Sequence, residues 1–576
     1  MLGRHPLSVT RRLVLLCFIG WTSHAIAQDE LTGQPLSPFG IGSCHVNNRS
    51  VRDYERWVPQ MQELGFASYR TPHCNWGSLE PEPGRWEFAE LDAQMDYLDA
   101  HGFRYGALLI GNPNWNTADP PGHLPVNNLE AWSNYVTQVA KHVKGRTTRL
   151  EIWNEPPNFT GKDQTPEDYA KIVVAAYDAA KAVDPSFQIG LAAKSAHVNY
   201  LEQTIRAGAK NHFDYIVLHP YEVMDGIADN LGTEVLFVNI VPTVRKMLAN
   251  CNPEKEEVPV MYTELGVDAS KGLEVQADAA VKAYALSMAG GVECLMWFEG
   301  RDGDSGPMGL IDRDGNKRPV YNALSTLVHQ LGAHPDYLGW VRIREQGLGF
   351  VFEGANGPAM IAWGQPGEPT ELRMPNEMTV VQLASGESQQ LRELSLGVTP
   401  VLFTELPDII VNRAKANAKK PLDWGGDYTD AKEVSIEYGE QIVERGLHTR
   451  AGEDIAKAVV AYGGSARAGS VPGGNAFIVD PGFLCYDTVP IEIELEVRRQ
   501  EQNENAGFKL VYESPEGFKT AGGWYTIPDN KQWHTVTFRV DDPQFVNYWG
   551  YNFLLQSDGN VYNKYYIRKA TVRKLE

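Results

Sequence analysis

Eight short apolar runs, each followed by a segment with helical periodicity, occupy the first part of the chain. The runs cover residues 39–43, 67–70, 105–110, 150–154, 189–192, 215–218, 260–263 and 294–298. Strands that alternate with helices indicate a parallel sheet, and eight such units in about 300 residues fit a (β/α)8 or TIM barrel. We therefore predict an α/β fold with a TIM-barrel domain over residues 28–331.

Two of these runs end in a glutamate. The run that begins at Leu150 stops at Glu155 before two prolines, and the run that begins at Val258 reaches Glu264 two residues before a glycine. The carboxyl ends of barrel strands form the mouth where chemistry takes place, so both carboxylates are candidates for catalysis. Strict strand alternation would send Asn154 and Glu155 to opposite faces, and we expect a bulge or a strained backbone there.

The sequences Trp153-Asn154-Glu155-Pro156 and Thr263-Glu264-Leu265-Gly266 together resemble clan A of the retaining glycoside hydrolases, a set of TIM barrels. Within the clan they are most similar to family 39-like or family 5-like enzymes. The resemblance implies that Glu155 on strand four is the acid/base and that Glu264 on strand seven is the nucleophile.

Retaining hydrolysis uses two carboxyl groups about 5–5.5 Å apart, one that protonates the leaving oxygen and one that attacks the anomeric carbon. It requires Glu264 to be ionised, and Glu155 to be kept protonated by its charged partner and partial burial. This chemistry needs no cofactor, and no spacing in the sequence resembles a metal site.

Other strand ends supply predicted substrate-binding residues. Arg70 ends the second strand, and the resemblance makes it a partner of Glu264, although a structural salt bridge would leave it in the same place. His219 and Tyr221 look like the clan's pair beside the nucleophile, with a core His and Tyr as the alternative. Asn154 is implied to hydrogen-bond the sugar 2-hydroxyl.

Three more residues complete the candidate set. Trp297 at the end of strand eight and Trp115 after strand three would form apolar walls for sugar rings. Tryptophan is common in cores too, and this alternative bears most on Trp115. His73 lies in the loop after strand two, which resembles a recurrent clan segment leading into a helix.

The pattern changes after the barrel. Residues 332–407 contain short alternating runs spaced by Gly and Pro, which predict a small β-sandwich. Residues 408–430 are interpreted as a linker or short helix. Residues 431–576 alternate more regularly and predict a jelly-roll domain, the architecture of many carbohydrate-binding modules. Aromatic residues near its turns suit either a glycan-binding face or a sandwich core, and the sequence leaves both open.

The first 27 residues have the features of a secretory signal peptide: three arginines, an apolar core over 13–21, and a small-x-small site ending at Ala27. Nine apolar residues are about half of what a membrane span requires. Thr10-Arg11-Arg12 leaves twin-arginine export open. We predict a secreted or periplasmic protein without membrane insertion.

Cleavage would remove three basic residues and leave a formal charge of −24, which argues against nucleic acid as a partner. Five cysteines would remain, which is no disulfide framework. Cys44 and Cys74 follow neighbouring strands, so a bridge and two thiols both stay open. The oligomeric state is not predicted.

The sequence therefore predicts a secreted retaining hydrolase that cleaves β-linked plant or algal polysaccharides or oligosaccharides. One alternative is a catalytically silent carbohydrate-binding surface protein, and another is a transglycosylase that uses the same residues. The presence of both Glu155 and Glu264 counts against the silent protein. The sugar, the linkage and exo or endo action are not predicted, because loop shape decides them.

Overall fold

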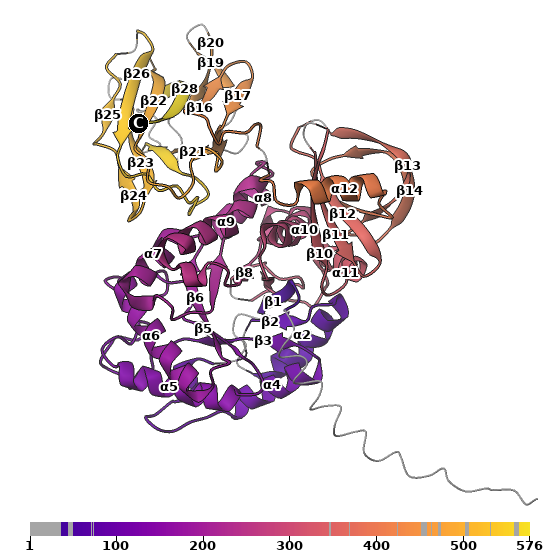
Figure 1. The fold of residues 1–576 in the computed structure, drawn as a ribbon, viewed down its shortest axis with the longest axis vertical. Coiled ribbons are helices and arrows are strands. Elements are labelled where there is room, and N and C mark those ends of the chain that lie inside the picture. Colours follow the sequence, from indigo (N-terminus) through magenta and orange to yellow (C-terminus); the bar gives the residue numbers. More distant parts are fainter. Residues whose placement is uncertain are drawn as a thin grey trace, which may run out of the picture.

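The computed structural model describes residues 36–43, 50–70, 72, 74–303, 305–344, 347–367, 369–422, 424–450, 458–461, 464–469, 474–500, 506–529, 531–557 and 564–575. These residues form a barrel, a six-stranded antiparallel sheet beside it and a C-terminal pair of sheets (Figure 1). The predicted signal peptide, His73 and Cys44 lie outside the described residues. Among the helices that are described, none has the length and apolar character needed to cross a bilayer.

The barrel is a nine-membered parallel sheet in the order β3-β2-β1-β9-β8-β7-β6-β5-β4. Gly106 separates β3 from β4, and because β3 pairs with β2 while β4 pairs with β5, the two are halves of one barrel strand. The predicted eight-stranded TIM barrel is thus confirmed, with β5 as its fourth strand and β8 as its seventh. The strands are β1 (Phe39–Ser43), β2 (Ser68–Tyr69), β3 (Arg104–Tyr105), β4 (Ala107–Leu109), β5 (Arg149–Ile152), β6 (Gln188–Lys194), β7 (Tyr215–His219), β8 (Val260–Leu265) and β9 (Cys294–Phe298).

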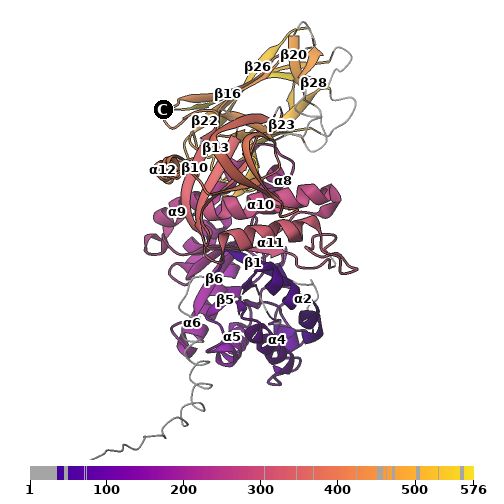
Figure 2. The same cartoon turned by 90° about the vertical axis from the view of Figure 1, so that its right-hand side faces the viewer.

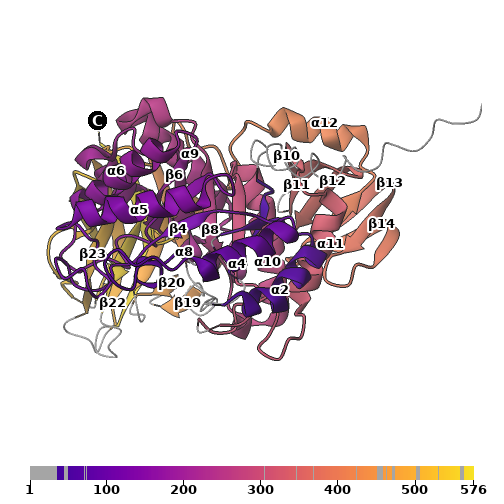
Figure 3. The ribbon, with the colours of Figure 1, turned by 90° about the horizontal axis from the view of Figure 1, so that it is seen from below.

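Helices surround the barrel (Figure 3). Local sequence explains their limits: α6 begins with a capping box in which the side chains of Thr165 and Asp168 each accept a hydrogen bond from the other's backbone N–H. Gly65 ends α2 in the left-handed conformation, with φ of 101°. The helices are α2 (Val51–Leu64), α3 (Trp76–Leu79), α4 (Ala89–Ala100), α5 (Leu129–Val143), α6 (Pro166–Val183), α7 (Val198–Thr204), α8 (Tyr221–Ala228), α9 (Glu234–Cys251), α10 (Leu273–Gly290) and α11 (Pro319–Leu331).

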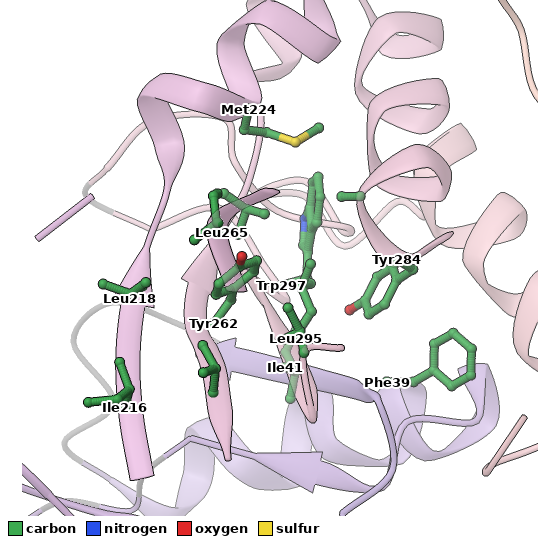
Figure 4. Close-up of a cluster of buried hydrophobic side chains, with 14 of the residues drawn as sticks. Phe39, Ile41, Ile216, Leu218, Met224, Tyr262, Leu265, Tyr284, Leu295 and Trp297 are labelled. Atoms are coloured by element: carbon green, nitrogen blue, oxygen red, sulfur yellow. The ribbon is translucent and has the colours of Figure 1, made fainter. Parts of the chain in front are cut away.

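Alternate residues of each barrel strand face the barrel interior or the helices. A small interior core contains Leu36, Ala192, Tyr215, Val217, Met261, Cys294 and Met296. Their neighbours, such as Ile216, Tyr262 and Leu295, point outward into the main core (Figure 4). At the strand ends, residues at the inward-facing positions of this alternation, which we call positions of inward parity, therefore reach the barrel mouth.

The second domain is one antiparallel sheet in the order β10-β11-β12-β15-β13-β14, where we predicted a sandwich. One face packs on α12 (Asp408–Asn417), which lies in the predicted linker, and the other face packs on the barrel (Figure 2). Gly339 allows the close approach, because a Cβ there would lie 1.9 Å from the Ala414 carbonyl oxygen. The helix and the barrel thus replace the second sheet. The strands are β10 (Asp336–Ile343), β11 (Gly347–Gly354), β12 (Gly357–Trp363), β13 (Thr370–Gln382), β14 (Ser388–Leu396) and β15 (Val401–Thr404).

The C-terminal domain has two antiparallel sheets around one apolar core, as a jelly-roll sandwich requires. The first sheet contains β16 (Glu433–Tyr438), β17 (Ile442–Arg445), β19 (Ala458–Ala461), β20 (Gly464–Ala468), β22 (Ile491–Arg499), β26 (His534–Val540) and β28 (Tyr565–Lys574). The second contains β18 (Leu447–Arg450), β21 (Asn475–Val479), β23 (Gly507–Ser514), β24 (Gly517–Thr520) and β27 (Phe553–Gln556), with β25 (Tyr525–Thr526) paired to β23.

Candidate active site

The backbone is irregular at the two strand ends that carry the glutamates. Trp153 and Glu155, after β5, have φ values of 65° and 45°, in the left-handed region that non-glycine residues rarely adopt. In β8, the register with β9 shifts between Tyr262 and Leu265. The strained backbone at Glu155 is the irregularity that the sequence predicts, whereas the register shift in β8 was not predicted. Together they let Glu155 and Glu264 both face the mouth.

Glu155 and Glu264 lie close together with His219 between them. One oxygen of each carboxylate and a ring nitrogen of His219 all lie within 4.8 Å of one another. The side chains of Glu155 and Glu264 are 12 % and 16 % exposed, so both are largely withdrawn from water yet open to the mouth. His219 Nδ1 is 2.9 Å from Glu155 Oε1 and 3.6 Å from Glu264 Oε2. Its main partner is therefore Glu155, although the resemblance placed it beside the nucleophile.

The other ring nitrogen of His219 also has a partner. Nε2 lies 2.9 Å from the hydroxyl oxygen of Thr263, a buried residue on β8. In the alternation of their strands, β7 and β8, His219 and Thr263 both occupy positions that face the interior of the barrel. The imidazole is therefore held between a hydroxyl and a carboxylate, and its tautomer decides which of them accepts a proton from it.

Arg70, at the end of β2, binds three groups of the site. Its guanidinium donates to Glu264 Oε1, to Asn154 Oδ1 at 2.7 Å and to Glu151 Oε1 at 2.5 Å. Arg70 and Glu151 are nearly completely buried, at 4 % and 5 % side-chain exposure. Burial opposes the charge on Arg70, but Glu151 and Glu264 outweigh it and raise the pKa of the guanidinium. Arg70 thus stays a cation that forms an ion pair with the Glu264 carboxylate.

Glu151 was missed in the sequence. It is the inward-facing carboxylate of β5 and neutralises part of the Arg70 charge inside the barrel. The signal was present, because a charged residue inside an otherwise apolar strand needs a buried partner. Thr263 was also given no role, since a threonine in a strand is unremarkable by itself.

Tyr221 begins α8 directly after β7 and points its hydroxyl at Glu264. The distance from the hydroxyl to Glu264 Oε2 is 3.5 Å. Burial raises the pKa of Tyr221 well above its ordinary value, and the negative charges of Glu264 and Glu155 add to this effect. The phenol therefore remains protonated and able to donate to the carboxylate.

The contacts of Glu155 favour its ionised form, contrary to our expectation. Burial alone would raise the pKa of this carboxyl group, but hydrogen bonding and positive charge from His219 outweigh it and lower the pKa below its ordinary value. Asn158 and Arg70 act in the same direction. The protonation of Glu155 therefore depends on the state of His219.

The two predicted tryptophan walls differ in their surroundings. Trp297 has no exposed surface and lies in the core beside Leu265 and Tyr284, outside the barrel (Figure 4), so the predicted wall role is wrong. Its neighbour Phe298 has the inward parity and is half-buried. Trp115 is half-buried in the loop after β4, and its indole N–H donates to the Glu80 carbonyl at 2.7 Å. Within the described part of the chain, its contacts do not include Glu155 or Glu264, and the wall role of Trp115 stays a prediction.

Among the described residues, Glu155, His219 and Glu264 are the one group of side chains close enough together to hold a metal ion. Glu264 already faces the Arg70 cation, which opposes a second cation at the same carboxylate. The donor set is therefore better suited to proton transfer and nucleophilic attack than to metal binding.

A TIM barrel with glutamates at the ends of its fourth and seventh strands, and with Arg, His and Tyr around them, is the architecture of a clan A glycoside hydrolase. The comparison of the sequence with protein families agrees, since residues 28–289 match the family model described as glycosyl hydrolases family 39. This match lies within the barrel domain and supports the predicted resemblance to clan A.

Two solved structures are similar to this chain, and the first of them supports the barrel fold. A family 39 glycoside hydrolase from the gut symbiont Bacteroides cellulosilyticus WH2 is 19 % identical with a TM-score of 0.54, over 64 % of this chain and 81 % of that chain. The exo-β-1,4-mannosidase Op5Man5 from Opitutaceae bacterium strain TAV5 is 17 % identical with a TM-score of 0.41, over 50 % and 59 % of the two chains.

Two curated relatives match over a short segment. They are a β-galactosidase from Thermus thermophilus, 34 % identical over 87 residues, and the β-galactosidase BgaA from a Thermus species, 33 % identical over 87 residues. Each match covers 15 % of this chain, and the chain spans 12 % of the length of these relatives.

Proposed function

We propose that this protein hydrolyses β-linked glycosides with retention of anomeric configuration. The observation that carries the proposal is the short separation of Glu155 and Glu264, whose nearest oxygens lie within 4.8 Å of each other. Retaining enzymes hold the two carboxyl groups about 5–5.5 Å apart, while inverting enzymes leave about 6.5–9.5 Å for a water molecule. The geometry supports direct attack by a carboxylate.

In the first step Glu264 attacks the anomeric carbon, and the bond to the leaving oxygen breaks as Glu155 gives that oxygen a proton. Arg70 and Tyr221 support the ionised nucleophile through their contacts with its two oxygens. In the second step Glu155, now ionised, takes a proton from water, and the resulting hydroxide displaces Glu264 from the sugar.

His219 and Thr263 supply a route to the protonated form of Glu155. If the neutral imidazole carries its proton on Nε2, that N–H donates to Thr263 Oγ1 and leaves Nδ1 as an acceptor. The hydrogen bond at Nδ1 then requires a proton on Glu155 Oε1. In the opposite tautomer Nδ1 donates and Glu155 is ionised, which is the form needed in the second step.

Asn154 is placed to bind the substrate through its amide nitrogen. Arg70 donates to Asn154 Oδ1, and this hydrogen bond assigns the oxygen and leaves the two N–H groups as donors. A donor beside the nucleophile suits the sugar 2-hydroxyl, whose hydrogen bond strengthens in the transition state.

The substrate class is a β-linked oligosaccharide or polysaccharide of plant or algal origin. The local similarity to β-galactosidases puts β-galactosides first among the sugars to test. The proposed location is outside the cytoplasm, supported by the signal-peptide pattern and by a family match that begins just after its cleavage site.

The test is a screen of the wild-type protein and Glu264→Ala on aryl β-glycosides of galactose, xylose, glucose and mannose. We expect the wild-type protein to hydrolyse at least one of these glycosides and Glu264→Ala to lose this activity. Added azide should restore turnover and convert the β-glycoside into an α-glycosyl azide, because azide attacks the face of the sugar that Glu264 occupied. Glu82→Ala, at an exposed glutamate in the loop after β2, is the control. Azide products of retained configuration would contradict the role of Glu264.

Two further readouts separate the alternatives. Addition of an acceptor sugar distinguishes hydrolysis from transglycosylation, because an acceptor-linked product replaces free sugar. Inactivity of the wild-type protein on the whole panel and on plant and algal polysaccharides would support the silent carbohydrate-binding protein.

A further inference from the structure

The C-terminal domain is docked on the barrel at the helices that follow β6 and β7 (Figure 1). On α7, Asn199 donates to the Ser514 carbonyl at 2.9 Å and Gln203 donates to the Pro515 carbonyl at 2.6 Å. On α9, Lys246 forms an ion pair of 2.6 Å with Asp487. Contacts on two helices hold the domain in one orientation, in contrast to a module on a flexible linker.

This contact extends to the strand ends at the active site. Ser195, the first residue after β6, is buried and donates its hydroxyl to the Tyr548 carbonyl at 2.8 Å. The Tyr548 ring stacks on His197 with 3.7 Å between ring centroids. The backbone of Ser195 also bridges to His219, whose Nδ1 contacts Glu155. A loop of the C-terminal domain therefore lies next to the catalytic group.

Lys194 and Trp549 meet across the same boundary. Lys194 ends β6 with inward parity, and its backbone N–H donates to the Pro156 carbonyl at 3.0 Å, directly after Glu155. Its ammonium nitrogen lies 4.6 Å from the centroid of the Trp549 ring. Trp549 belongs to the C-terminal domain and is half-buried. The cation and the indole thus stand beside the segment that carries the acid/base.

The loop that carries Trp549 has a defined conformation. The buried carboxylate of Glu513 accepts hydrogen bonds from the backbone of Val546 at 2.9 Å, from the backbone of Tyr548 at 2.6 Å and from the side chain of Asn552 at 3.0 Å. These bonds fix the backbone on both sides of the indole. A preorganised aromatic group loses little conformational entropy when it binds a ligand.

The position of Lys194 and Trp549 relative to Glu155 indicates which part of a substrate they meet. The acid/base protonates the leaving oxygen, so the leaving sugar lies on the Glu155 side of the mouth. An indole face packs on the apolar face of a sugar ring, and an ammonium group donates to hydroxyls. Both groups are present at this place.

We propose that Trp549 and Lys194 form the binding site for the leaving-group sugar, so that the C-terminal domain completes the active site. This inference rests on the proposed glycosidase function and assigns the domain a part in substrate selection. The same site receives the acceptor sugar in any transglycosylation, because the acceptor enters where the leaving group departed.

The test compares an aryl β-glycoside with the β-1,4-linked disaccharide of the same sugar, in wild type, Trp549→Ala and Lys194→Met. We expect Trp549→Ala to lower kcat/KM for the disaccharide by about tenfold, a typical loss for a truncated aromatic anchor. The aryl glycoside should change by less than about twofold, because it places no sugar at this site. Lys194→Met should act in the same direction with a smaller loss.

Trp533→Ala is the matched control, because Trp533 is a half-buried indole of the same domain with Arg568 at 4.6 Å from its ring. It leads into β26 in the other sheet, and its loss should leave both substrates unchanged. Equal losses on both substrates in Trp549→Ala, or a thermal unfolding shift without substrate discrimination, would show a purely structural interface and overturn the inference.

A binding measurement separates this inference from the proposed function. Titration calorimetry of Glu264→Ala with cellobiose, xylobiose and β-1,4-galactobiose, with and without Trp549→Ala, requires no turnover. Weaker binding in the double variant supports the site even if the wild-type protein is inactive. Equal affinities, or no binding of any disaccharide, reject it even if aryl glycosides are hydrolysed.

Discussion

Thr263→Val perturbs the group that we propose controls the proton on Glu155. His219 has one partner at each nitrogen, Thr263 Oγ1 and Glu155 Oε1, both at 2.9 Å. Valine has nearly the shape of threonine but can neither accept a hydrogen bond from Nε2–H nor donate one to Nε2. A buried N–H without a partner is tolerated less well than an acceptor without one. The imidazole then gains by carrying its proton on Nδ1 and donating to Glu155, which favours the ionised carboxylate.

The size of the effect follows from this single hydrogen bond. Its loss is worth about 0.5–1.5 kcal/mol, and a pKa unit corresponds to about 1.36 kcal/mol, so the pKa of Glu155 should fall by about 0.4–1 unit. The proton donor is lost when Glu155 ionises. The basic limb of the pH profile of kcat/KM should therefore move to lower pH by the same amount.

The assay is the pH dependence of kcat/KM on a disaccharide, since a poor leaving group needs the proton. Thr263→Ser is the control, because serine retains the hydroxyl and should retain the wild-type basic limb. A Thr263→Val profile that does not move, moves to higher pH, or moves equally in Thr263→Ser would refute the tautomer argument.

Three other predictions follow from the contacts. Glu155→Ala should lower kcat/KM for disaccharides by on the order of 10²–10⁴ and spare aryl glycosides with good leaving groups in the first step; equal losses would exclude the acid role. Arg70→Met should lower the free energy of unfolding by about 3–5 kcal/mol in denaturant titrations, because Glu151 becomes a buried unpaired charge; a loss below about 1 kcal/mol would contradict the buried pair. Burial raises the pKa of Glu513 to about 7, so its contribution to stability is full below about pH 4.5 and falls by about 3 kcal/mol as the pH rises through 7. Glu513→Gln should abolish this dependence, and parallel pH curves for the two proteins would contradict it.

The sequence by itself determined the barrel and the candidate catalytic pair. All eight predicted runs coincide with barrel strands, because parallel strands buried on both faces are continuous apolar runs that can be read locally. The sequence also identified the candidate site residues Glu155, Glu264 and Arg70, because a charged side chain at the end of such a run faces the barrel mouth. The irregular strand end at Glu155 could also be anticipated, since alternation alone would have separated Asn154 from Glu155.

Only the tertiary structure decided which side chains meet. Trp297 and Phe298 are adjacent, and strand register alone sends the first to the core and the second toward the mouth. The partners of His219 and the burial of Glu151 against Arg70 depend on neighbouring strands that are distant in sequence. The second domain needs α12 and the barrel to cover its sheet, and Trp549 lies beside Lys194 only because its domain docks on α7 and α9. Such contacts depend on which surfaces of the folded chain pack together. A local pattern of residues does not contain that information.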